Sequence, residues 1–170
     1  MASTIDKRVL LNNQQYVDKF RGDGLDIHPA SKVVIVTCMD CRIDPISFCG
    51  FKLGEATIIR NAGAYAGEAA RSALLTTHIL GAEDIYIIKH TKCGLLGVDA
   101  NVARHAIKQN LGITESKDVD AFEVFPITDL DKSAAEDVEF FRNHPLMMPK
   151  IRVTGWVYDT DSGTLKQIVS

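Results

Sequence analysis

Two stretches of the chain, KVVIVTCMDCR at residues 32–42 and IYIIKHTKCG at residues 85–94, share one layout. Each begins with a short run of β-branched and aromatic residues, at 33–36 and 85–88, which is typical of a strand buried on both faces of a sheet. Each run then gives way to cysteine or histidine, the side chains that bind soft metal ions. The sequence therefore predicts two buried strands that lead directly into a chemically active region.

Three of these side chains are placed to meet. Cys38 follows the first run, His90 follows the second, and Cys93 lies three residues further on. In an open parallel sheet, ligands bind outside the carboxyl ends of the strands. If the two strands are parallel neighbours, the three side chains converge on one point. Two cysteines and one histidine leave the fourth tetrahedral position open, which is the layout of a catalytic zinc rather than a structural one.

The remaining pattern predicts an α/β fold. Strand and helix signals alternate along the chain, which favours a mainly parallel sheet flanked by helices. We expect an amphipathic N-terminal helix over residues 3–20, a strand over 122–127, a helix from Asp131 to about Asn143, and a C-terminal β-hairpin turning at 159–163. Because no repeat, low-complexity tract or linker interrupts the chain, we expect residues 1–170 to form a single domain.

Composition excludes several classes of protein. The net charge of −3 gives no basic footprint for nucleic acid, so we expect no nucleic-acid partner. No apolar run approaches the roughly 18 residues that a membrane helix needs, and the first residues lack the layout of a secretion signal. We therefore expect a cytoplasmic protein without a membrane partner. The four cysteines are too few for a disulfide scaffold, so metal binding or catalysis is their expected use.

Two other interpretations of the cysteines stay open at this point. Cys38 and Cys41 form a CxxC pair, which can act as a thiol-redox centre at the start of a helix. Alternatively, Cys38, Cys41, His90 and Cys93 can supply four ligands to a structural zinc. The first alternative leaves His90 and Cys93 unexplained, and the second leaves Asp40 and Arg42 without a role.

Three motifs together resemble the β-class carbonic anhydrases, in the compact branch of the family that also includes carbonyl sulfide hydrolases. The motifs are Cys38-x-Asp40-x-Arg42, Arg60-Asn61-Ala62-Gly63 and His90-x-x-Cys93-Gly94. Each motif alone is weak evidence, but the combination is specific. The resemblance extends over nearly the whole chain, from the N-terminal helix to the closing hairpin.

The resemblance implies a role for each motif residue. Cys38, His90 and Cys93 would bind Zn²⁺. Asp40 would accept a hydrogen bond from the zinc-bound water, and Arg42 would hold Asp40 in place. Gly94 would lie beside the substrate.

The resemblance also implies an activity and an assembly. The protein is expected to be a lyase in which zinc hydroxide hydrates carbon dioxide reversibly to bicarbonate. The alternative on the same zinc site is carbonyl sulfide hydrolysis, which yields carbon dioxide and hydrogen sulfide. Members of the family pair through the N-terminal helix, so a homodimer or a higher homo-oligomer is expected.

Overall fold

A five-stranded sheet forms the centre of the molecule. The structure is a computed structural model that describes residues 3–22 and 24–170. The strands lie in the order β2-β1-β3-β4-β5; the first four are parallel and β5 is antiparallel to β4. Their bounds are β1 Val33–Cys38, β2 Ala56–Asn61, β3 Asp84–His90, β4 Arg152–Tyr158 and β5 Leu165–Val169. The predicted α/β class, mainly parallel sheet and C-terminal hairpin are confirmed.

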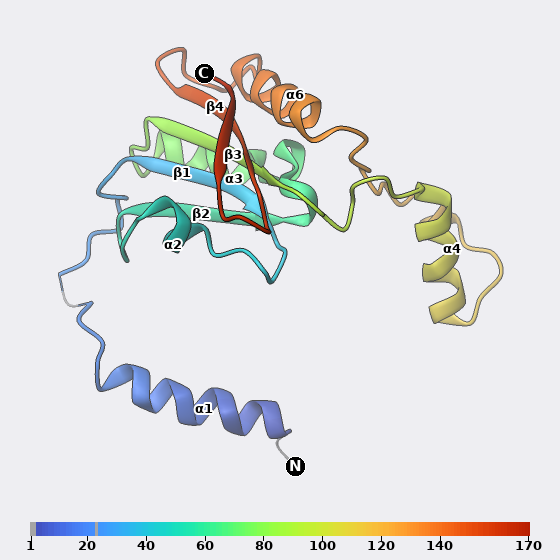
Figure 1. Ribbon diagram of the computed structural model, residues 1–170, viewed down its shortest axis with the longest axis horizontal. Helices are drawn as coiled ribbons and strands as arrows, with labels where there is room; N and C mark the ends of the chain where they lie inside the picture. The colour runs from blue at the N-terminus through green and yellow to red at the C-terminus, as the bar shows by residue number, and fades with distance from the viewer. Residues whose placement is uncertain (1–2, 23) are drawn as a thin grey trace.

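Helices cover the sheet on both faces (Figure 1). The helices that pack on it are α2 Pro45–Cys49, α3 Ala66–His78 and α6 Leu130–Arg142. The others are α1 Thr4–Val17, η1 Ala62–Ala64, α4 Ala100–Leu111 and α5 Lys117–Asp120, of which α1 and α4 stand apart from the sheet. Successive side chains of β1 point to opposite faces of the sheet and are apolar on both, so both faces must be covered by other elements. Val34 and Val36 pack against α3 and α6, whereas Val33 and Ile35 pack on the side of α2. A strand buried on both faces reads as a continuous apolar run.

The register of the two central strands positions the chemistry. β1 and β3 are parallel neighbours, with Thr37 opposite Ile88. Cys38 and His90, which end these strands, therefore emerge at the same edge of the sheet.

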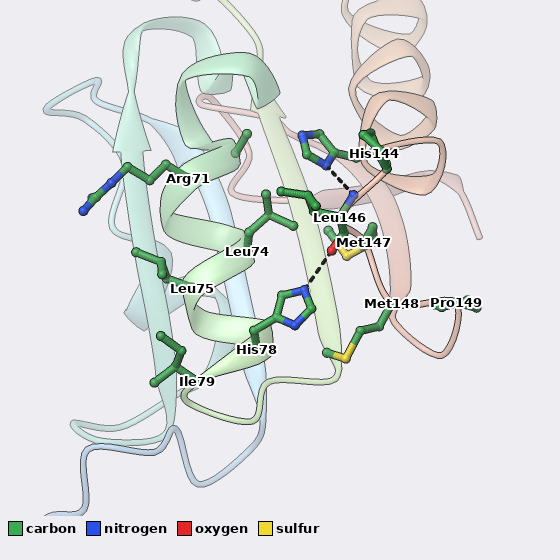
Figure 2. Close-up of a pocket in the computed structure, with 12 residues that line it drawn as sticks. Arg71, Leu74, Leu75, His78, Ile79, His144, Leu146, Met147, Met148 and Pro149 are labelled. Atoms are coloured by element: carbon green, nitrogen blue, oxygen red, sulfur yellow. Dashed lines mark hydrogen bonds between the residues drawn. The ribbon is translucent and has the colours of Figure 1, made fainter.

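Two apolar surfaces lie outside this core. Helix α1 stands apart from the sheet (Figure 1), and none of its residues is buried. A groove of about 930 Å³ runs between the outer side of α3 and residues 144–149 (Figure 2). In this groove, His78 of α3 donates a hydrogen bond of 2.8 Å to the carbonyl oxygen of Leu146, which joins the two walls. No helix among residues 3–22 and 24–170 has the length and apolar character needed to cross a membrane.

Two local predictions were wrong. Residues 122–127 do not form a strand, because Phe125 adopts the left-handed conformation (φ 49°) and Pro126 has no N–H to donate. Only an isolated bridge joins Ile127 to Leu96. Helix α6 is capped by Asp129, which accepts from the backbone N–H of Lys132, and not by Asp131. The cap therefore lies two residues before its predicted position.

Candidate metal centre

The structure brings Cys38, His90 and Cys93 together. Cys38 ends β1, His90 ends β3, and Cys93 lies in the loop that follows. The three potential ligand atoms all lie within 4.8 Å of one another. All three residues are buried, with exposed fractions of 5%, 1% and 7%. A cluster of ligand groups is thus enclosed by protein at the carboxyl edge of the sheet.

The His90 imidazole is turned for metal binding. Its Nδ1 lies 2.9 Å from the carbonyl oxygen of Thr91, which can only accept, so Nδ1 carries the proton. Nε2 is then left with a lone pair. It is buried and has no hydrogen-bond partner among the described residues. A buried polar atom without a partner is costly, and a cation next to Nε2 would satisfy it.

The two thiols lie close enough together to bind one cation. The sulfur atoms of Cys38 and Cys93 lie 4.0 Å apart. A hydrogen bond from Cys93 lowers the pKa of Cys38 to about 4, and the same bond, together with burial, raises the pKa of Cys93 far above its usual range. A divalent cation would allow both sulfurs to be thiolates, because it neutralises their mutual repulsion.

These observations fit zinc. Two thiolates and a neutral imidazole are ligands of a borderline-soft ion, and three protein ligands leave one tetrahedral position open. Such an ion would give the unpartnered Nε2 atom a partner and would neutralise the two sulfur atoms that lie 4.0 Å apart.

A carboxylate lies beside this cluster and is held by an arginine. Arg42 binds Asp40 bidentately, with Nε 2.9 Å from Oδ1 and an Nη atom 2.6 Å from Oδ2. These bonds hold the pKa of Asp40 well below its usual range, so Asp40 is a carboxylate at neutral pH. Its Oδ2 atom also lies 3.8 Å from Nε2 of His90. The carboxylate is therefore within reach of whatever binds at the cluster.

The backbone of the second ligand loop supports the same arginine. Lys92, between His90 and Cys93, adopts the left-handed conformation with φ 55°. The carbonyl oxygen of Lys92 accepts a hydrogen bond of 2.7 Å from Arg42. Arg42 thus links the loop after β1 to the loop after β3, so the Asp40 carboxylate and the Cys93 sulfur are positioned together.

A small cavity opens at the cluster. It measures about 280 Å³ and is lined by Cys38, Met39, Asp40, Ala62, Gly63, Cys93, Gly94 and Leu95. A Cβ atom added at Gly94 would meet no atom within 4 Å, so the backbone of Gly94 faces open space. Most of the lining is apolar, which suits a small uncharged molecule.

The remaining cysteines lie outside the cluster. Cys41 is exposed and Cys49 is half-buried; burial raises the pKa of Cys49 to about 11. The group of possible metal ligands found among residues 3–22 and 24–170 contains Cys38 but not Cys41. This geometry favours a three-ligand site over a CxxC redox pair or a four-ligand structural zinc.

Arg60 has a role at the centre that the sequence analysis did not assign. It donates hydrogen bonds of 3.0 Å to the carbonyl oxygen of Cys38 and 2.5 Å to that of Asp40. It therefore fixes the backbone that carries the first ligand. The sequence places Arg60 in the Arg60–Gly63 motif, which indicates a functional role. Its contact with the backbone of Cys38 and Asp40 follows from the pairing of β2 with β1, which the sequence does not show.

Comparisons with known proteins agree with this geometry. A family model described as carbonic anhydrase matches residues 33–165. Beta-carbonic anhydrase 1 of Mycobacterium bovis is 28% identical over 166 residues, covering 97% of this chain and 98% of that protein. The solved structure of the carbonic anhydrase from Glaciozyma antarctica superimposes with a TM-score of 0.90 at 32% identity, covering 99% of this chain and 100% of that one.

A second group of relatives has a different activity. A carbon disulfide hydrolase of Acidithiobacillus thiooxidans is 31% identical over 153 residues, covering 78% of this chain and 74% of that protein. The chain is thus similar to enzymes that act on two different small molecules.

The three-ligand geometry predicts the effect of removing one sulfur. Cys93→Ser should abolish stoichiometric zinc binding, because a serine hydroxyl is a poor replacement for a thiolate ligand. The metal content of the purified variant, measured by atomic emission, checks this. Cys41→Ser is the matched control and should keep one zinc per chain. Full metal content in Cys93→Ser would remove Cys93 from the ligand set.

Proposed function

This chain belongs to the carbonic anhydrase family, and we propose that it is a zinc enzyme that hydrates carbon dioxide reversibly to bicarbonate. The observation that carries the proposal is the enclosed cluster of two thiols and one unpartnered imidazole nitrogen, with the Asp40–Arg42 pair beside it. That combination supplies both a place for a metal and a fixed hydrogen-bond acceptor next to it.

Cys38, His90 and Cys93 would hold the zinc ion. When bound, zinc lowers the pKa of a water molecule to roughly 7 and so supplies a nucleophile at neutral pH. The enclosure of the three ligands limits access of bulk water to the site. A reducing compartment would keep the two sulfurs as thiols, and on this ground we propose a cytoplasmic location.

Asp40 would orient the reacting water. An ionised carboxylate only accepts hydrogen bonds, so it fixes the direction of one O–H bond and turns an oxygen lone pair towards the substrate. Arg42 occupies both carboxylate oxygens of Asp40, which holds the side chain in one orientation. We assign Asp40 and Arg42 to the catalytic machinery on this basis.

Gly94 would form part of the substrate site. Its backbone borders the cavity of about 280 Å³, whose other walls include Ala62 and Leu95. A linear, apolar molecule such as carbon dioxide suits a cavity of this character. The absence of a side chain at Gly94 would let the substrate approach the backbone closely.

A second candidate activity uses the same site. Carbonyl sulfide and carbon disulfide are also linear and are attacked at carbon, and the likeness to carbon disulfide hydrolases supports this alternative. Hydrolysis of carbonyl sulfide would release carbon dioxide and hydrogen sulfide.

The decisive experiment is a turnover assay of the zinc-loaded protein with carbon dioxide, carbonyl sulfide and carbon disulfide in parallel. We expect rapid hydration of carbon dioxide and little release of hydrogen sulfide. The reverse result would assign the chain to the sulfur substrates. Turnover of none of the three by a fully loaded protein would contradict the proposed function.

The orienting role of Asp40 predicts a variant that keeps the metal but loses activity. Asp40→Asn should retain one zinc per chain, while kcat for carbon dioxide hydration falls by roughly 100-fold, since a misplacement of a reacting group by about 1 Å can cost this much. Asp161→Asn is the control, because Asp161 is an exposed carboxylate paired with Lys92 near the same loop. Equal kcat values for Asp40→Asn and the wild-type protein would exclude the assigned role.

We also propose that the chain forms a homodimer or a larger homo-oligomer through α1. The helix carries large apolar side chains that are more than half exposed, among them Val9 and Tyr16. Leaving such a face in water is unfavourable, and a second copy would cover it. The apolar groove beside α3 (Figure 2) is a surface on the same chain that a helix from a second copy could cover in return.

Acidic substitutions on the apolar face of α1 should therefore dissociate the proposed homo-oligomer. Val9→Asp combined with Tyr16→Asp is expected to give a monomer in sedimentation velocity, because the charges would be buried at the interface. The control pair is Lys7→Asp with Gln14→Asp, which has the same spacing but lies on the opposite side of the helix. Identical sedimentation of both variants and the wild-type protein would argue against α1 as the interface.

A further inference from the structure

Lys89 is a buried cation that the proposed reaction does not use. It precedes the candidate ligand His90 on β3 and is only 2% exposed. A lysine ammonium is rarely buried unless every donor has a partner. Here it forms an ion pair with Asp137 of α6, which is also buried. The pair thus joins the central strand to the helix that covers it.

The other two donors of Lys89 go to a single turn. Its Nζ atom lies 2.9 Å from the carbonyl oxygen of Gly63 and 3.1 Å from that of Ala64. An ammonium group has three donors, and these two carbonyls with Asp137 account for all of them. Asp137 in turn accepts a hydrogen bond of 3.2 Å from the backbone N–H of Ala66, where α3 begins. Both ends of the short segment 63–66 are therefore held by the pair.

This turn has an unusual backbone that needs support. Gly63 and Ala64 both adopt positive φ angles, 69° and 56°. The left-handed conformation is uncommon for a residue with a side chain, so Ala64 is held there by its surroundings. The bonds from Lys89 to the carbonyls of both residues supply a direct restraint.

The same turn forms a wall of the candidate metal centre. Gly63 lines the same cavity as Cys38. Cys38 pairs with Asn61, the last residue of β2, so the turn begins directly beside this ligand. A Cβ atom at Gly63 would lie 3.1 Å from Leu95 and 3.2 Å from Ile127, so there is little room for the turn to move on that side. A shift of the turn would therefore alter the surroundings of a ligand directly.

We propose that Lys89 and Asp137 are positioning residues that clamp the Gly63–Ala64 turn against the metal centre. The inference rests on the proposed zinc site, towards which the turn is directed. A buried ion pair contributes little to stability compared with apolar side chains of similar size. Its geometry here, with every donor directed at the turn or at Asp137, indicates that its main role is to place the turn.

The test is a double variant that removes the charges without leaving one unpaired. Lys89→Met with Asp137→Asn keeps an oxygen that can accept from the N–H of Ala66, but removes all three donors of Lys89. We expect the variant to fold. Backbone amide exchange at Gly63 and Ala64, measured by NMR in the metal-free protein, should be faster than in the wild-type protein. Zinc affinity, measured by competition with a chelator, should fall roughly 10- to 100-fold, as for other groups that support metal ligands.

A further substitution separates positioning from loss of charge. Ala64→Gly, added to the double variant, should recover part of the zinc affinity, because glycine adopts the required φ without strain. The control is Lys32→Met with Glu83→Gln, which removes an exposed ion pair at the opposite end of the sheet and should leave affinity and exchange unchanged.

The outcomes are distinct. A folded double variant with wild-type zinc affinity and wild-type exchange at Gly63 would overturn the clamp. If the double variant does not fold, Lys89→Met alone is measured in its place, because it also removes all three donors to the turn and to Asp137. Unchanged zinc affinity and amide exchange in that variant would again overturn the clamp. A wild-type protein that binds no zinc would instead contradict the proposed function, whereas the exchange measurement on metal-free protein would still test the clamp.

Discussion

The structure depends on the parallel pairing of β1 with β3. Because the two strands run side by side in register, the residues that end them emerge at one edge of the sheet, and Cys38 meets His90 there. Both strands are buried on both faces, so their register is fixed by packing against α3 and α6 on one side and by aromatic residues on the other. The candidate metal centre is therefore placed by two strands that are packed on both faces.

Around that centre, the loops are held by charged side chains as well as by apolar packing, in which Ile43 and Ile127 lie against Cys38 and Cys93. Arg42 joins the two ligand loops through Asp40 and the carbonyl oxygen of Lys92, and Arg60 binds the backbone of the first loop. Lys89 adds a third cation, directed at the turn after β2. Loops carry little apolar surface of their own, so cations that bind several carbonyl and carboxylate oxygens at once are an effective way to fix them.

Two outer surfaces of the chain expose apolar side chains to solvent. Helix α1 exposes its apolar side chains, and the groove beside α3 is lined by apolar residues (Figures 1 and 2). Helix α1 contributes no buried residue to the core of one chain, and the groove leaves Leu75, Ile79 and Leu146 exposed. Both surfaces are readily understood if the functional unit contains more than one copy, in which the core supplies the chemistry and the outer surfaces supply the assembly.

The sequence by itself determined the class of fold and the candidate ligands, because both rest on local patterns. Continuous apolar runs predict buried strands, and the spacing of Cys38, His90 and Cys93 relative to those runs predicts where their side chains emerge. Tertiary structure alone decided the rest. The acceptors of Lys89 and the contact of Arg60 with the first ligand loop depend on segments that lie far apart in the chain. Residues 122–127 do not pair as a strand because of the backbone conformation of Phe125, which no local pattern encodes. A lysine following Ile87 and Ile88 in a buried strand signals that a partner must exist, but only the packing of α6 on β3 identifies it as Asp137.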